Sequence, residues 1–140
     1  SVEEMEVMAE EEIEADISEE IIEPEINAKK KSEELASVIA KKWVIDKVEL
    51  VVPGITQDLT KYYQATTFSF NTDQSVTFTE VVEGVSKTSF GTWKLSKINK
   101  IEMRIEDNLR TFVILESSNN IFIIKDENEK NYYKYYLISE

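Results

Sequence analysis

Apolar and small polar residues alternate in two short runs near the middle of the chain. Phe68 and Phe70 are separated by a serine, and Val76 and Phe78 are separated by a threonine. Successive side chains of a strand point to opposite faces, so this alternation predicts two strands that bury these four residues. The polar segment 71–74, Asn-Thr-Asp-Gln, has the composition of a turn. The pattern therefore predicts a β-hairpin at the centre of the fold.

The same pattern continues through most of residues 43–140 and predicts eight strands. They are expected at 43–52, 65–70, 75–82, 87–95, 98–105, 109–115, 120–125 and 131–138. Most of the links are short, so successive strands must be antiparallel, because a parallel pair needs a crossover of a dozen residues or more. Eight such strands remove their exposed edges most simply by closing. We therefore expect a mainly β fold: an eight-stranded up-and-down antiparallel β-barrel preceded by an acidic N-terminal segment.

Helical spacing precedes the strands and also occurs in the longest link. Five apolar residues recur at steps of four: Met5, Ala9, Ile13, Ile17 and Ile21. The neighbouring glutamates repel one another, so this segment is either a helix docked on a partner surface or a disordered arm. Pro24 ends the pattern, and Ser32 is the expected N-cap of a second, short helix. In the link 53–64, segment 58–63 is expected to form one helical turn across a barrel mouth.

Charge divides the chain into two parts. Residues 1–40 contain 14 acidic residues and 3 lysines, whereas residues 41–140 contain 14 acidic and 13 basic residues. We expect an acidic arm or linker at 1–31 and the barrel, with its short leading helix, at 32–140. A near-neutral domain lacks the clustered Lys and Arg that bind phosphate backbones, so we expect no nucleic-acid partner.

The side-chain inventory excludes several chemistries. The chain has no His and no Cys, which removes Ser-His-Asp and Cys-His catalysis and the usual ligands of zinc. Only three glycines are present, and they form no phosphate-binding loop. We therefore expect no enzymatic activity, no catalytic residues, no cofactor and no metal site.

Four sequence features carry a family resemblance. Trp43 opens the first strand after a short helix, Phe-Ser-Phe-Asn-Thr-Asp follows at 68–73, Phe-Gly-Thr-Trp-Lys-Leu lies at 90–95, and Tyr-Tyr-Lys-Tyr-Tyr-Leu closes the chain at 132–137. In this order they resemble the short bacterial lipocalin-like domains of cell-envelope lipoproteins. The resemblance implies a secreted protein, periplasmic or anchored in the outer membrane of a bacterium. Its membrane contact would be only through a lipid anchor that this chain does not contain, with the acidic arm as the tether.

The predicted lumen supplies the candidate site. Trp43 is expected to close one end of the barrel. The expected ligand-binding residues point into the lumen and are mostly aromatic: Phe68, Phe70, Val76, Phe78, Trp93, Met103, Phe112, Tyr133 and Tyr135. In the last strand, the pattern leaves open whether Tyr133 and Tyr135 or the alternate pair, Tyr132 and Tyr136, face the lumen. These side chains either surround a cavity or simply fill the core.

Two functions follow from these alternatives. With a hollow lumen, the protein is a carrier or binder of a small apolar ligand. With a filled lumen, it is a protein-protein interaction module of the cell envelope, and the acidic amphipathic arm at residues 2–22 binds the partner.

Overall fold

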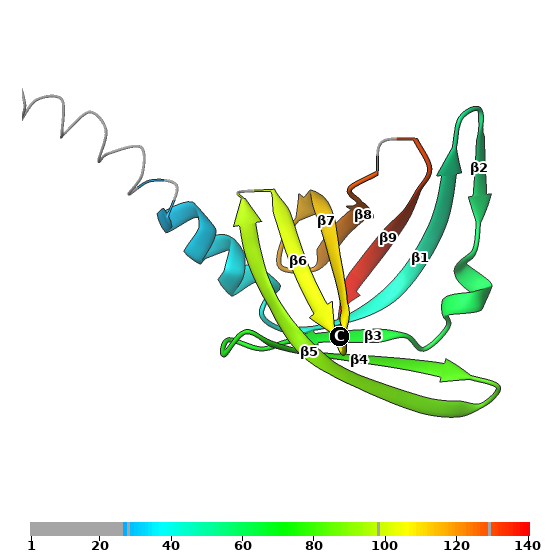
Figure 1. The fold of residues 1–140 in the computed structure, drawn as a ribbon, viewed down its shortest axis with the longest axis horizontal. Coiled ribbons are helices and arrows are strands. Elements are labelled where there is room, and N and C mark those ends of the chain that lie inside the picture. Colours follow the sequence, from blue (N-terminus) through cyan, green and yellow to red (C-terminus); the bar gives the residue numbers. More distant parts are fainter. Residues whose placement is uncertain (1–26, 28, 98, 129) are drawn as a thin grey trace, which may run out of the picture.

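The computed structural model describes residues 27, 29–97, 99–128 and 130–140. The predicted amphipathic segment at 2–22 therefore lies outside the described residues. Within the described residues, nine strands and one 3-10 helix follow an N-terminal helix (Figure 1). The strands are β1 (Lys42–Val52), β2 (Ile55–Asp58), β3 (Thr67–Phe70), β4 (Ser75–Val82), β5 (Val85–Lys97), β6 (Lys100–Ile105), β7 (Asn108–Ser117), β8 (Ile121–Asp126) and β9 (Tyr132–Ser139), and the 3-10 helix is η1 (Thr60–Tyr63).

Eight of the strands form a closed ring. β1 pairs with β3, each strand from β3 to β9 pairs with the next, and β9 pairs back with β1. Every pair is antiparallel. The predicted up-and-down barrel is confirmed, with β2 as one extra strand that extends the sheet from β1.

The pattern of apolar and polar residues did not predict β2. This strand pairs with the distal part of β1, and Gly54 adopts a φ of 80° in the turn between them. All four β2 residues are exposed. A strand with no buried face needs no alternation of apolar and polar residues, so the sequence carries no pattern that predicts such a strand.

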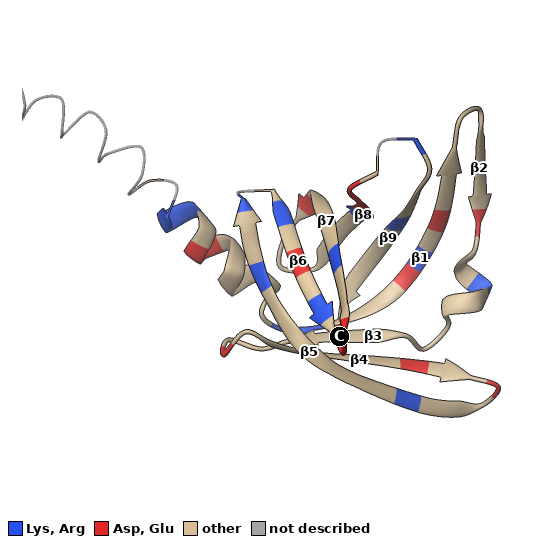
Figure 2. Ribbon diagram, viewed as in Figure 1, with Lys and Arg blue, Asp and Glu red and all other residues tan. Residues whose placement is uncertain are grey.

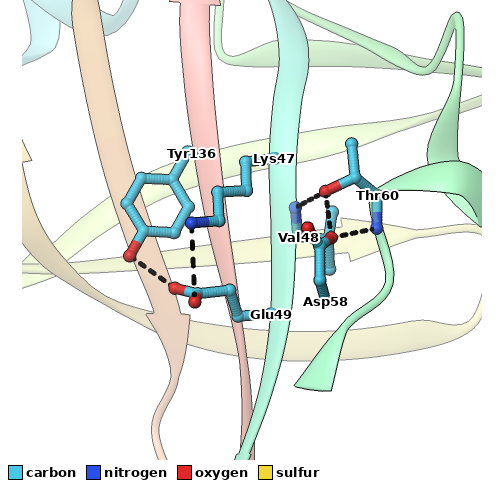
Figure 3. A network of polar contacts seen from close by, with 6 residues as sticks. All are labelled: Lys47, Val48, Glu49, Asp58, Thr60 and Tyr136. Carbon is cyan, nitrogen blue, oxygen red and sulfur yellow. Dashed lines mark hydrogen bonds and ion pairs between the residues drawn. The ribbon is translucent and has the colours of Figure 1, made fainter. Parts of the chain in front are cut away.

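The 3-10 helix η1 confirms the helical turn that was expected within 58–63. Asp58 stabilises its start, because its carboxylate accepts hydrogen bonds from the backbone and the hydroxyl group of Thr60. These bonds also hold the pKa of Asp58 below its usual value. The hydroxyl of Thr60 in turn accepts a hydrogen bond from the backbone N–H of Val48, at 3.2 Å (Figure 3). This chain of bonds ties η1 to β1.

The N-terminal helix packs on the barrel end that lies away from the β1–β2 and β4–β5 hairpins (Figure 1). It includes residues 29–39, so Ser32 lies inside the helix, and the predicted N-cap at this residue is wrong. The reason is local, because Lys29–Lys31 are good helix formers and continue the helix toward the N-terminus. The helix thus extends to both sides of the expected boundary between an arm at 1–31 and a barrel domain at 32–140.

The core follows the alternation along the strands. Fifteen apolar residues of the described part of the chain are buried, and the largest with almost no exposure are Trp43, Phe70, Phe112 and Phe122. Gly91 of β5 is required by close packing of two strands. A Cβ at this position would overlap the carbonyl oxygen of Arg104 on the adjacent strand β6. Glycine therefore lets two strands approach closely at this point of the ring.

Candidate functional site

A cavity of about 240 Å³ lies inside the barrel, between strands β3 to β7. Its apolar wall consists of five side chains, Phe68, Phe78, Met103, Ile105 and Phe112. Its polar residues are Lys87, Ser89, Glu106, Asn108 and Arg110. Apart from Ser89, these polar residues are exposed, so the cavity has an apolar wall and a polar rim that solvent can reach.

Strand register explains why the cavity forms here. Phe78 pairs with Phe68 on one side and with Ser89 on the other, so all three side chains point into the lumen. The side chain of Ser89 is far smaller than a phenyl ring and leaves space opposite two aromatic residues. On the other wall, Met103 pairs with Arg110, which places a cation at the inner face of β7.

The structure separates the predicted site residues into two groups. Phe68, Phe78, Met103 and Phe112 meet at the cavity. The other five do not line it: Phe70, Val76, Trp93 and Tyr135 are buried in the core, and Tyr133 is half-buried against it. A ligand-binding role of any of the nine stays a prediction.

The last strand shows which tyrosines face inward. Tyr133 and Tyr135 pack with the core, whereas Tyr136 lies on the outer face, where its hydroxyl donates a hydrogen bond of 2.6 Å to Glu49 (Figure 3). Lys47 approaches the same carboxylate at 3.6 Å. Positions of both charge signs are interspersed along the strands (Figure 2).

A polar cluster stands beside the cavity. The Nη2 atom of Arg110 donates hydrogen bonds to Asp126, at 2.8 Å, and to the hydroxyl of Tyr135, at 3.2 Å. The guanidinium also lies over the ring of Phe112, 4.7 Å from its centre. Tyr63 of η1 meets the edge of the Tyr135 ring, with 6.0 Å between the ring centres. The cluster fixes the guanidinium between an acid and an aromatic surface.

Burial and hydrogen bonds together set the pKa values of this cluster. It raises the pKa of Tyr135 to about 12, and the hydrogen bond from Arg110 opposes the shift only in part. Burial also raises the pKa of Tyr63, with the neighbouring Tyr133 acting in the same direction. For Arg110, burial lowers the pKa, but the contacts with Tyr135 and Asp126 outweigh burial and raise it. The cluster therefore holds one permanent cation and two neutral phenols at neutral pH.

Tyrosine ionisation tests this cluster. Of the six tyrosines, Tyr135 is expected to ionise near pH 12, as a late step in an ultraviolet titration of phenolate absorbance. Because the raised pKa favours the neutral phenol in the folded state, this contribution to stability is complete below about pH 10 and is lost as the pH rises through about 12.

Two matched variants assign the late step. Tyr135→Phe should remove this late step, whereas Tyr62→Phe should leave it in place, since Tyr62 is 68% exposed and makes none of the contacts of the cluster. A titration with no step near pH 12 would contradict the buried position of Tyr135.

The polar residues of the cavity and Ile105 were not among the residues that the sequence predicted for the site. One signal for Arg110 was present, because it stands two residues before Phe112 on the same strand and so shares its inward face. A charged residue on an inward face marks a polar feature in a barrel lumen. No comparable signal existed for Glu106, because it lies in the β6–β7 turn with a φ of 57°, outside the alternation.

Two kinds of feature are absent from the described part of the chain. No helix there is long and apolar enough to cross a membrane. No group of three or more acidic, His or Cys side chains there is arranged to hold a metal ion.

Comparison with known proteins identifies the class of fold. No family model and no curated protein sequence matches the chain. Among solved structures, a lipocalin-like protein from Bacteroides uniformis superimposes with a TM-score of 0.58 at 15% sequence identity, covering 74% of this chain and 99% of the other. At this identity the similarity shows the fold alone. The chain has the fold of a lipocalin-like β-barrel, as the motifs at 43, 68–73, 90–95 and 132–137 had implied.

Proposed function

We propose that this protein is an exported barrel that binds a small apolar ligand in the cavity between β3 and β7. The observation that carries the proposal is the apolar wall of Phe68, Phe78, Met103, Ile105 and Phe112, which surrounds empty space beside an exposed rim. A largely apolar cavity with a few polar groups is the usual form of a small-molecule site. The lipocalin-like fold supports the same reading.

The cavity limits the size of the ligand. Its volume of about 240 Å³ equals roughly eight water molecules, at about 30 Å³ each. A chain of about eight methylene groups would fill this space. At about 0.8 kcal/mol for each buried methylene, such a chain gains about 6 kcal/mol, which corresponds to a dissociation constant of roughly tens of micromolar.

The proposal favours binding over catalysis and places the protein outside the cytoplasm. The absence of His and Cys supports the first part, because the commonest acid-base and nucleophilic groups are missing. The resemblance of residues 38–140 to envelope lipocalin-like domains supports export to the periplasm or the outer membrane of a bacterium.

The cavity weighs against the alternative function. A protein-interaction module with a filled barrel would have no space beside Phe78 and Met103, yet the cavity lies there. Its proposed partner-binding arm, residues 2–22, lies outside the described residues. The apolar-ligand function is therefore the better supported of the two.

A series of n-alcohols tests the proposed function. Isothermal titration calorimetry from hexanol to dodecanol should show affinity rising roughly fourfold for each added methylene. Burial of one methylene contributes about 0.8 kcal/mol of binding free energy. The increase should level off once the chain exceeds the length that the cavity holds, at about eight to ten carbons. Absence of binding, or affinity that does not depend on chain length, would refute the proposal.

A further inference from the structure

Arg110 carries more hydrogen-bond donors than the protein uses. A guanidinium has five N–H donors, and both hydrogen bonds described for Arg110 come from its Nη2 atom. Within the described residues, its other two nitrogens make no hydrogen bond to the protein. The side chain is 50% exposed at the cavity rim, so these donors can meet a bound molecule.

The guanidinium is also held in position before any ligand arrives. Asp126 anchors it from β8, and the same carboxylate accepts the backbone N–H of Tyr133 at 2.9 Å. Phe112 lies beneath it and Tyr135 beside it. A fixed planar guanidinium loses little entropy on binding and matches the two oxygens of a carboxylate.

The remaining charges at the rim are balanced. Lys87 lies on β5, and its Cα partner across the hairpin is Glu80 of β4. Glu106 is the acidic residue of the cavity lining. Asp126 neutralises part of the charge of Arg110. The rim therefore carries no large net charge, and the fixed donors of Arg110 decide which head group fits.

We propose that the ligand is an amphiphile with a carboxylate head group, which Arg110 binds at the rim while the apolar tail lies between Phe78 and Met103. This inference rests on the proposed function, because it requires the cavity to accept an apolar chain. It adds the chemical class of the ligand and its orientation. Lys87 supplies a second positive charge near the head group, and Glu106 opposes an anion there.

Three probes of equal chain length test the inference on the full chain at neutral pH. Calorimetry should show n-decanoate binding about tenfold more tightly than n-decanol, because a charge-assisted bond to a half-exposed arginine keeps part of its strength in water. The cationic n-decylamine should bind most weakly. Equal affinity for decanoate and decanol would overturn the inference and leave the proposed function standing, whereas no binding of either would overturn both.

The two arginines of the chain provide a matched pair of variants. The double change Arg110→Met, Asp126→Asn removes the cation without leaving its acidic partner unpaired, and should lower decanoate affinity about tenfold with decanol affinity unchanged. Arg104→Met is the control, because Arg104 is exposed on the adjacent strand and does not line the cavity. Loss of decanoate affinity in the control, or none in the double variant, would contradict the role of Arg110.

A single surface variant allows the inference to be tested if the double variant does not fold. If the double variant fails to give a folded far-UV spectrum, Glu106→Gln removes the opposing charge from an exposed turn. It should strengthen decanoate binding by a few-fold and leave decanol unchanged. Unchanged or weaker decanoate binding in this folded variant would count against a head group at the rim.

Discussion

Ser89→Trp is expected to abolish binding of n-decanol and n-decanoate, with a loss of affinity of roughly two-hundredfold. Ser89 is 8% exposed and its side chain faces Phe78 across the hairpin, inside the cavity. An indole at this position would occupy space that about four methylene groups of the ligand would otherwise fill. At about 0.8 kcal/mol each, their exclusion costs about 3 kcal/mol of binding free energy.

The neighbouring residue gives a matched control for this substitution. Thr88 precedes Ser89 on β5 and is exposed, so Thr88→Trp adds the same indole outside the cavity. Calorimetry of this variant should return the affinity of the original protein within about twofold. Ser89→Trp should keep the urea midpoint close to the original, because the indole enters existing space rather than a packed core. Undiminished ligand binding by folded Ser89→Trp would place the ligand elsewhere.

Trp43→Ala is expected to lower the free energy of unfolding by about 3 to 5 kcal/mol. Trp43 has no exposed surface, and its ring centre lies 5.4 Å from that of Phe122. Its indole nitrogen donates a hydrogen bond of 2.9 Å to the carbonyl oxygen of Ile39, the last residue of the N-terminal helix. Truncation leaves a void in the core and an unpaired buried carbonyl. Since a domain of this size is stable by about 5 to 15 kcal/mol, the loss is a large share.

Urea unfolding followed by circular dichroism measures this loss. Tyr62→Ala is the control for removal of a large aromatic side chain, because Tyr62 is 68% exposed, and it should change stability by less than about 0.5 kcal/mol. Trp43→Phe keeps most of the ring and tests the hydrogen bond to Ile39, with an expected loss of about 1 to 3 kcal/mol. The same set tests whether Trp43 closes the barrel end, which stays a prediction. A loss below 1 kcal/mol in Trp43→Ala would argue against it.

The alternation of residues predicted the barrel because it is a local signal. Each ring strand has one face toward the core, so the pattern at Phe68 to Phe78 and at Met103 to Phe112 is visible without any knowledge of partners. Short polar turns then require antiparallel neighbours in chain order. Where this signal is absent, prediction failed: β2 has no buried face, and the N-terminal helix begins earlier than the capping residue Ser32 suggested.

The candidate site was harder to predict because a cavity is a property of packing. Phe70 and Phe78 have the same inward position on their strands, yet Phe70 is buried in the core and Phe78 borders empty space. The difference arises from what stands opposite each ring. Phe78 faces Ser89, whereas Phe70 meets the edge of Trp93. Such pairings depend on the register of strands that lie far apart in the sequence.

The sequence by itself determined the class of fold, most of the large apolar residues that face inward and the absence of His and Cys chemistry. Composition and a repeat of two residues are sufficient for these conclusions, since both can be read from neighbouring positions. Only the tertiary structure decided that the lumen is hollow beside Ser89 and that Asp126 and Tyr135 hold Arg110 at its rim. The physical reason is that empty space and hydrogen bonds between strands exist only after ring closure has placed distant side chains together.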